Sequence, residues 1–129
     1  MDMFENKKSI VINFTNHPSK LWDAAQKEAA SKYGEIVDVP FPQVDENANS
    51  EEVMQLAQKY VDKIIEMKPA MVVCQGEFCL TYYVVKQLKE NSIKVMAACS
   101  KRETYEIQND DGSVVKTAVF KFVQFRDYM

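Results

Sequence analysis

The sequence has few of the features that would identify a function directly. It contains three glycines and one histidine among its 129 residues. Gly76 follows a continuous apolar run, but it has no glycine partners around it. A dinucleotide-binding fingerprint and a phosphate-binding loop both need several glycines at fixed spacings. We therefore do not expect NAD or ATP as a ligand, and we expect no cofactor.

Membrane segments, a secretory signal and an excess of positive charge are also missing. No apolar run approaches the ~20 residues that span a bilayer, and residues 1–9 contain no apolar core of a secretory signal. The formal net charge of −3 argues against a general nucleic-acid binder, which is usually basic. We expect a cytoplasmic protein without a membrane or duplex nucleic acid as partner. A local basic pocket for a small anion is compatible with this charge.

Cysteine pairs at zinc-binding spacing are missing too. The three cysteines, an odd number, indicate free thiols in a reducing cytoplasm. The spacings of Cys74, Cys79 and Cys99 do not match the close Cys/His pairs of zinc sites. The sequence favours buried thiols, and we expect no metal site.

What is present centres on residues 70–91, which read as a buried strand, a tight turn and a helix. Met71 to Cys74 form an apolar run typical of a parallel strand covered on both faces. Gln75 and Gly76 interrupt the run, and Glu77 opens a helix, where a carboxylate is favourable. Ligands of open α/β sheets bind at the carboxyl ends of the strands. We expect the site at this turn.

The rest of the chain predicts a single α/β domain over residues 1–129. Apolar runs predict strands at 9–14, 36–39, 71–74 and 93–99, and amphipathic segments predict helices over 18–33, 49–67 and 77–91. Leu21, Trp22, Ala25, Ala29 and Tyr33 mark the expected apolar face of the first helix, and Asn49 with Glu52 resembles a capping box. This alternation favours a doubly wound parallel sheet ordered 2-1-3-4, with helices on both faces.

The C-terminal segment predicts an antiparallel β-hairpin that extends the sheet. Residues 103–108 and 114–125 are strand-like and are joined by Asn109-Asp110-Asp111-Gly112. Strict alternation places Phe120 and Phe122 on one face of the last strand, and Val119, Val123 and Phe125 on the other. Because both faces are apolar, we expect cover from a helix and from a second subunit.

Polar residues follow three of the predicted strands at the carboxyl edge. They are Thr15, Asn16 and His17, then Gln75, Gly76 and Glu77, then Ser100, Lys101, Arg102 and Glu103. Arg and Lys suit phosphate binding, and His17 is the one side chain that titrates unperturbed near neutrality. Each group also has a plain structural interpretation. His17 could cap a helix, Lys101 and Arg102 could lie in a solvated loop, and Glu77 could serve only the helix dipole, which we favour.

Three segments resemble an accessory CRISPR-associated family of small Rossmann-like proteins found with type III systems. They are Asn13-Phe14-Thr15-Asn16-His17-Pro18, then Gln75-Gly76-Glu77-Phe78 followed by Thr81-Tyr82, and a C-terminal series of Ser100-Lys101-Arg102-Glu103, Asp111-Gly112-Ser113-Val114 and a closing aromatic–Arg–Asp–Tyr over 119–128. The resemblance covers roughly the last 60 residues well and the first 20 weakly. Asn16 stands as an extra residue before His17 relative to the family pattern.

The resemblance implies a ring nuclease, a protein that binds and cleaves cyclic oligoadenylate second messengers. It implies a Rossmann-like three-layer sandwich that acts as a homodimer with the ring across the two-fold axis. The ribose 2′-hydroxyl can attack the adjacent phosphate without a metal. On position and chemistry we assign catalytic roles to His17, Arg102 and Lys101. Ligand-binding roles go to Thr15, Asn16, Gln75, Gly76, Glu77, Phe78 and Ser100.

Three other functions remain open at this point. The same pocket could sense a cyclic nucleotide without cleaving it, because binding and cleavage need the same phosphate contacts. A nucleotide-processing enzyme, such as a deoxyribosyltransferase-like hydrolase, would use Glu77 as nucleophile or base. A purely structural protein would act as an interaction partner of a CRISPR complex.

Overall fold

The structure is a computed structural model that describes residues 9–129. The prediction that no secretory signal is present concerns residues 1–9, and all but the last of these lie outside the described part. Its elements are β1 (Ile10–Thr15), the 3-10 turn η1 (Ser19–Leu21), α1 (Ala24–Ser31), β2 (Glu35–Asp38), α2 (Ser50–Met67), β3 (Met71–Gln75), α3 (Phe78–Glu90), β4 (Val95–Gln108) and β5 (Val114–Asp127). No helix within residues 9–129 is both long and apolar enough to cross a membrane.

The five strands form one sheet in the order β2-β1-β3-β4-β5. β1 pairs in parallel with both β2 and β3, and β3 pairs in parallel with β4. Only β4 and β5 are antiparallel. The predicted order 2-1-3-4 and the hairpin extension are confirmed. The switch point lies between β1 and β3, where the chain leaves the sheet toward α1 on one face and α3 on the other.

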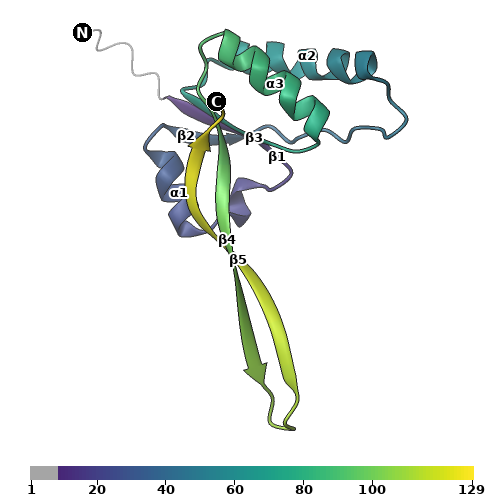
Figure 1. The fold of residues 1–129 in the computed structure, drawn as a ribbon. Coiled ribbons are helices and arrows are strands. Elements are labelled where there is room, and N and C mark those ends of the chain that lie inside the picture. Colours follow the sequence, from purple (N-terminus) through teal and green to yellow (C-terminus); the bar gives the residue numbers. More distant parts are fainter. Residues whose placement is uncertain (1–8) are drawn as a thin grey trace, which may run out of the picture.

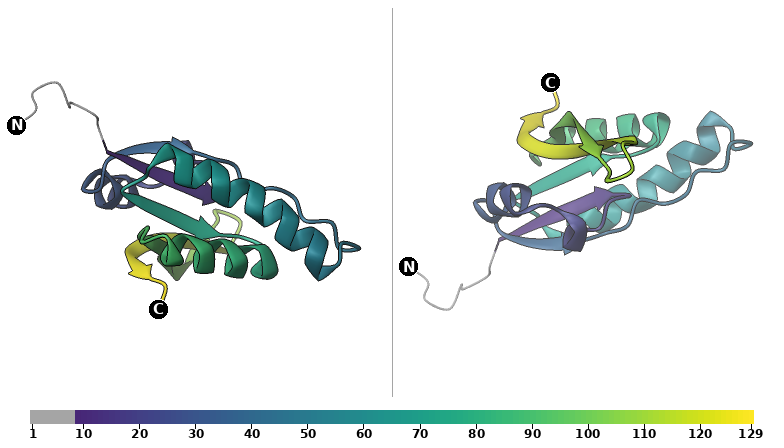
Figure 2. Two further views of the ribbon diagram at one scale, coloured as in Figure 1. Left: turned by 90° about the horizontal axis from the view of Figure 1, so that it is seen from above. Right: turned by 90° about the horizontal axis from the view of Figure 1, so that it is seen from below.

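The sheet is the middle layer of three. α1 lies on one face, and α2 and α3 lie side by side on the other (Figure 2). Alternate residues of β1 and β3 therefore enter two separate cores. Ile12, Phe14, Val72 and Cys74 pack under α2 and α3, and Val11, Met71 and Val73 pack with Trp22 under α1. This is the Rossmann-like sandwich that the sequence predicts.

The helix ends follow local sequence signals. Asn49 and Glu52 form the predicted capping box at the start of α2, which satisfies two backbone donors. Lys68 ends that helix in the left-handed conformation. The side chain of Glu77 accepts a hydrogen bond from the backbone N–H of Leu80 at 2.8 Å and so caps α3. These caps fix the points where the chain enters and leaves the sheet.

The first predicted helix is wrong in its start and in its face. The chain forms η1, breaks, and begins α1 only after Asp23, whose side chain accepts from the backbone N–H of Gln26 at 2.8 Å. Trp22, Gln26 and Ala30 are buried, whereas Leu21 is 61% exposed. The capping carboxylate restarts the helix and rotates its buried side by one residue from the predicted one.

β4 and β5 continue far beyond the rest of the sheet as a two-stranded hairpin (Figure 1). Each strand has 14 residues, and they stay paired from Met96 with Asp127 to Gln108 with Val114. We call residues 100–122 of this hairpin the arm. The base is tied to the body by Tyr128, whose hydroxyl donates to the carbonyl of Cys74 at 2.7 Å. The expected helix cover along the whole last strand is wrong, because α1 contacts β5 only near the base.

Candidate functional site

A cavity of about 520 Å³ lies at the carboxyl ends of β1 and β3, between η1, α1 and the arm. We call it the switch-point pocket. Its lining comprises Thr15, Asn16, His17, Leu21, Trp22, Asp23, Gln26, Val73, Gln75, Gly76, Ala98, Ser100, Phe120 and Phe122. The volume falls within the range of small-molecule sites. Six predicted site residues are thus brought together: Thr15, Asn16, His17, Gln75, Gly76 and Ser100.

A hydrogen-bond network centred on the buried side chain of Asn13 holds the loop that carries His17. The amide of Asn13, on β1, donates to the backbone carbonyl of His17 at 2.9 Å and to Asp38 at 3.0 Å. The hydroxyl of Thr15 lies 2.7 Å from the amide oxygen of Asn13 and accepts from the backbone N–H of His17 at 3.1 Å. Asn13 is 1% exposed. The side chains of Asn13 and Thr15 therefore position the loop that carries His17.

The carbonyl of His17 also accepts from the indole N–H of Trp22 at 3.2 Å. The backbone of His17 is consequently fixed from both sides of the loop. Among the described residues, no hydrogen bond engages its imidazole, which is exposed in the pocket. The ring is free to bind a ligand or to exchange a proton, and it does not cap a helix.

Gln75 has a structural use that the sequence does not reveal. Its amide donates to the carbonyl of Ala98 at 3.2 Å and accepts from the N–H of the same residue at 2.9 Å. The side chain thereby continues the β3–β4 pairing beyond Val73 and Met96, the last paired residues of these strands. Gln75 sets the position of β4, and hence of Ser100, at the pocket rim.

Gly76 is required by packing rather than by backbone conformation. A Cβ at this position would lie 2.4 Å from the buried ring of Phe41. A larger residue at this turn would therefore have to displace Phe41.

Glu77 and Phe78 do not reach the switch-point pocket. They line a different cavity of about 750 Å³, between the start of α3 and the loop before α2. The backbone hydrogen bond from Leu80 lowers the pKa of Glu77, as expected for a helix-capping carboxylate. Glu77 and Phe78 therefore do not share the switch-point pocket with the other predicted residues, and Glu77 caps α3; their ligand-binding roles stay predictions.

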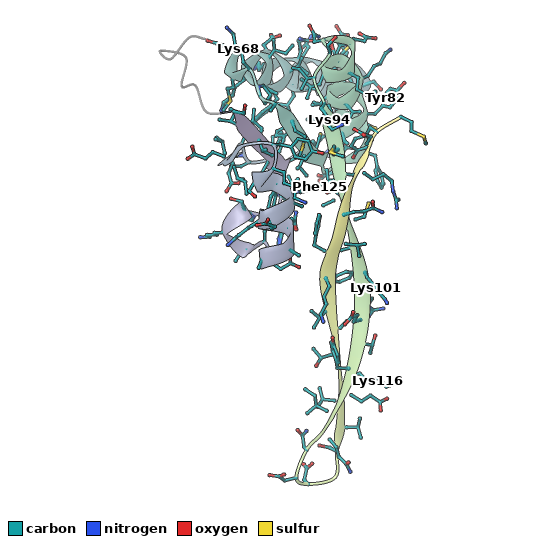
Figure 3. All side chains as sticks on the ribbon, turned by 90° about the vertical axis from the view of Figure 1, so that its left-hand side faces the viewer. Lys68, Tyr82, Lys94, Lys101, Lys116 and Phe125 are labelled. Atoms are coloured by element: carbon teal, nitrogen blue, oxygen red, sulfur yellow. The ribbon has the colours of Figure 1, made fainter. Side chains whose placement is uncertain are left out.

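Lys101 and Arg102 do not lie in a loop, because β4 continues through them. Lys101 pairs with Lys121, and Arg102 pairs with Phe120. Side chains alternate along a strand and directly paired residues share a face. Arg102 therefore shares the face of Ser100 and Phe120, both in the pocket lining, and Lys101 lies on the opposite face. Figure 3 shows Lys101 and Lys116 on the arm, away from the helices.

A β-bulge at the base of the arm brings Phe125 onto the face that carries Phe120 and Phe122. Cys99 pairs with Gln124, but Ser100 pairs with Phe122, so Val123 is the extra residue. The insertion moves Phe125 onto the face of Phe122, and their ring centroids lie 4.8 Å apart. The predicted opposite-face placement of Phe125 is wrong for this reason.

Sequence reasoning missed Trp22, Gln26, Phe120 and Phe122 as site residues. Trp22 and Gln26 were hidden by the assumption of one continuous helix, although Asp23 carries the signal of an N-cap. Phe120 and Phe122 were assigned to a covered strand. Their alternation did predict the shared face, but only the structure shows that this face borders the pocket.

Asp23 joins the arm to α1. Its second carboxylate oxygen accepts from the backbone N–H of Phe122 at 3.1 Å. The hydrogen bonds from Gln26 and Phe122 lower the pKa of Asp23. The negative charge of Asp23 is thus stabilised by backbone N–H donors of α1 and β5. The contact with Phe122 also holds the arm against the body.

The three cysteines differ in environment. Cys74 is buried, and burial raises the pKa of its thiol to about 12. Cys79 is exposed and Cys99 is partly exposed, so the prediction of buried thiols holds for one of three. Within residues 9–129, no group of three or more His, Cys, Asp or Glu side chains is arranged to hold a metal ion.

Residues 9–126 match the model of a protein family described as the uncharacterized protein MJ1673 family. The match covers most of the chain and includes the sheet, the switch-point pocket and the arm, and the protein belongs to this family. A comparison with curated proteins finds no match.

Proposed function

We propose that this MJ1673-family protein binds a cyclic oligoadenylate in the switch-point pocket and cleaves it without a metal, as a cytoplasmic homodimer. The observation that carries the proposal is the exposed imidazole of His17 in a pocket bordered by Ser100 and by the Arg102 face of the arm. Arg102 is not itself a lining residue, but it pairs with Phe120, which is. An imidazole and a guanidinium within reach of one ligand suit proton transfer next to a phosphodiester.

The proposed reaction needs only proton transfer and charge stabilisation. The 2′-oxygen forms a bond to phosphorus while the bond from phosphorus to the 5′-oxygen breaks. The 2′-hydroxyl loses a proton and the departing 5′-oxygen gains one, which leaves a 2′,3′-cyclic phosphate and a 5′-hydroxyl. His17 serves one of these two transfers, and Arg102 stabilises the negative charge on the phosphoryl oxygens.

The size of the pocket and the exposed arm support the proposal of a homodimer. A cavity of about 520 Å³ suits one nucleotide better than a whole ring, and two pockets across a two-fold axis would hold a symmetric ring. Val123, at the base of the arm, is 59% exposed. Light scattering with ligand at micromolar concentration tests the dimer, and a monomer mass would contradict it.

The direct test is incubation of the purified protein with cyclic tetra-adenylate and EDTA, followed by separation of the products. We expect linear products that end in a 2′,3′-cyclic phosphate. His17→Ala should abolish most cleavage and retain most binding, because a residue that moves a proton contributes chiefly in the transition state. Unchanged cleavage by His17→Ala would contradict the assignment.

Arg102 and Lys101 supply a matched pair of variants. They are adjacent cations on opposite faces of β4. Replacing either one by Ala removes one positive charge, but only Arg102 is on the pocket face. Arg102→Ala should weaken binding or slow cleavage roughly tenfold to a hundredfold, since a charge-assisted hydrogen bond contributes about 1.5–3 kcal/mol. The catalytic role predicted for Lys101 is not part of this proposal, because Lys101 lies on the face away from the pocket, and Lys101→Ala should leave both near wild type. Equal effects would indicate a general loss of charge rather than a directed contact.

The alternatives are separated by the same assays. A sensor would bind cyclic tetra-adenylate and release it intact. A deoxyribosyltransferase-like enzyme would depend on Glu77, which caps α3 and lines the other cavity. Its placement makes this second alternative the weaker one. Glu77→Gln is therefore expected to leave ring cleavage intact.

A further inference from the structure

We propose that the pocket face of the arm stacks a nucleobase of the ligand, with Phe120 as the outer stacking surface and Phe122 as the inner one. The proposal rests on the proposed nucleotide function and names the part of the ligand that the arm recognises. It makes the hairpin a component of the binding site rather than a spacer.

The exposure of Phe120 is the first observation. The ring is 68% exposed although it borders a cavity. Exposing a large aromatic side chain to water forgoes the free energy of its burial. Neighbouring Phe122 is partly buried and packs against Phe125 with an interplanar angle of 60°. The arm therefore presents one fixed ring and one uncovered ring along the same wall.

The aromatic wall continues to the floor of the pocket. Phe125 packs against Trp22 with ring centroids 6.2 Å apart. Trp22 is 4% exposed and is held by its indole bond to His17. Ring contacts thus run from Trp22 through Phe125 to Phe122, and the exposed Phe120 follows two residues earlier on the same face of β5. Flat apolar surfaces of this kind accept the π-face of a base.

Polar groups lie on the two edges of this wall. Ser100 pairs with Phe122, and Arg102 pairs with Phe120, on the same face. His17 lies in the loop after β1. A base against the phenylalanines would carry its ribose and phosphate toward these polar side chains. The apolar and polar parts of a nucleotide therefore match separate parts of the site, and the larger π-surface of a purine should bind more tightly than that of a pyrimidine.

The opposite face of the arm offers an internal control. Val119 is the neighbour of Phe120 in β5 and pairs with Glu103 on the other face. It is 39% exposed, so Val119→Ala changes the arm without touching the pocket. Phe120→Tyr keeps the aromatic surface, and Phe120→Leu keeps an apolar side chain but loses the π-face. Because Phe120 is exposed, none of these variants removes core packing.

Trp22 is the only tryptophan of the chain, and it lines the pocket, so its fluorescence reports on the site. We would titrate each variant with cyclic tetra-adenylate whose 2′-hydroxyls are methylated, which cannot be cleaved by 2′-hydroxyl attack. Phe120→Ala and Phe120→Leu should weaken binding by roughly fivefold to a hundredfold. Phe120→Tyr and Val119→Ala should bind within about twofold of wild type. Cyclic tetra-uridylate, methylated in the same way, should bind wild type more weakly.

The outcomes separate this inference from the proposed function. If wild type binds cyclic tetra-adenylate and Phe120→Ala binds it equally well, the stacking role is overturned and the function stands. Wild type could also fail to bind cyclic tetra-adenylate but bind AMP, GMP or a cyclic dinucleotide. The proposed function would then be overturned, and loss of that binding in Phe120→Ala would still support stacking. If wild type binds none of these nucleotides, both are overturned.

Discussion

The body of the sheet and the arm are made of similar residues but exist in opposite environments. Ile12 and Val72 in the body are fully buried between two helix layers. Ile107 and Val115 in the arm are 54% and 47% exposed, because no helix of residues 9–129 lies over that part of the sheet (Figure 1). Burial therefore depends on what covers a strand, and the apolar pattern of the strand alone does not decide it.

The difference also separates two sources of stability. The body gains stability from side chains that are distant in sequence, such as those of α2 against β1 and β3. The arm gains it from a local hairpin with cross-strand pairs, and an isolated two-stranded ribbon is marginal in water. We expect the arm to open locally at a lower free energy than the body.

The largest difference in the free energy of unfolding should come from replacing one isoleucine by alanine in the body and one in the arm. Ile64 is fully buried under the sheet, so Ile64→Ala should lower the free energy of unfolding by about 2–5 kcal/mol. Ile107→Ala should change it by less than about 0.5 kcal/mol. Urea denaturation of both variants measures this, and a large loss in Ile107→Ala would show that the arm is covered in solution.

Two glycines, one in the body and one at the tip of the arm, allow a second comparison of the two regions. A Cβ on Gly34 would lie 2.3 Å from the carbonyl oxygen of Ser9, where β1 and β2 begin to pair, and its φ is +153°. Gly34→Ala should destabilise the whole domain by about 1–3 kcal/mol from backbone strain alone. Gly112 has a φ of +87° with nothing nearby, so Gly112→Ala should strain only the arm tip. Thermal unfolding distinguishes a domain-wide shift from a change confined to amide exchange at the tip.

Thiol chemistry tests the burial of the central strand. Cys79 should react with an alkylating reagent in native protein, whereas Cys74 should stay protected until the body unfolds. Burial raises the folded pKa of Cys74 from 9.0 to about 12, so its protonated form stabilises the fold below pH 9 and this contribution is lost as the pH rises through 12. The stability advantage of wild type over Cys74→Ala should shrink across that range. Rapid native labelling of Cys74 would contradict the buried strand.

The smallest effect is expected from an ion pair of the arm. The Nζ atom of Lys116 lies 3.9 Å from Oε1 of Glu106, and both side chains are mostly exposed. Lys116→Ala should change the free energy of unfolding by less than about 1 kcal/mol, and salt should reduce even that. Calorimetry at low and high salt measures it. A larger loss would indicate that Lys116 has a partner outside this chain.

The sequence predicted the sheet order, the hairpin and most element positions, because their signals are local. A strand such as Met71–Gln75, a capping box at Asn49 and a turn ending in Gly112 are each encoded within a few residues. Topology then followed from the handedness of the crossovers. The loops carrying His17 and Gly76 were placed together correctly for the same reason.

The failures arise where one residue changes the register of everything after it. The Asp23 cap restarts a helix, and the bulge at Val123 moves Phe125 to the other face. The continuation of β4 through Lys101 could not be predicted, because a charged residue is equally compatible with a loop and with an exposed strand. The amide of Gln75 takes the place of a backbone group in pairing with β4. A contact of this kind has no recognisable pattern in the sequence.

The bond between Asp23 and Phe122 has a consequence for how the protein is made. It joins positions 99 residues apart. At a synthesis rate of about 5–20 residues per second, roughly 5–20 s separate the emergence of the two partners from the ribosome. During that interval the His17 loop can form but has no aromatic wall opposite it. The pocket is completed only by β5, the last strand of the described chain to be translated, so a partly synthesised chain lacks the aromatic side of the pocket.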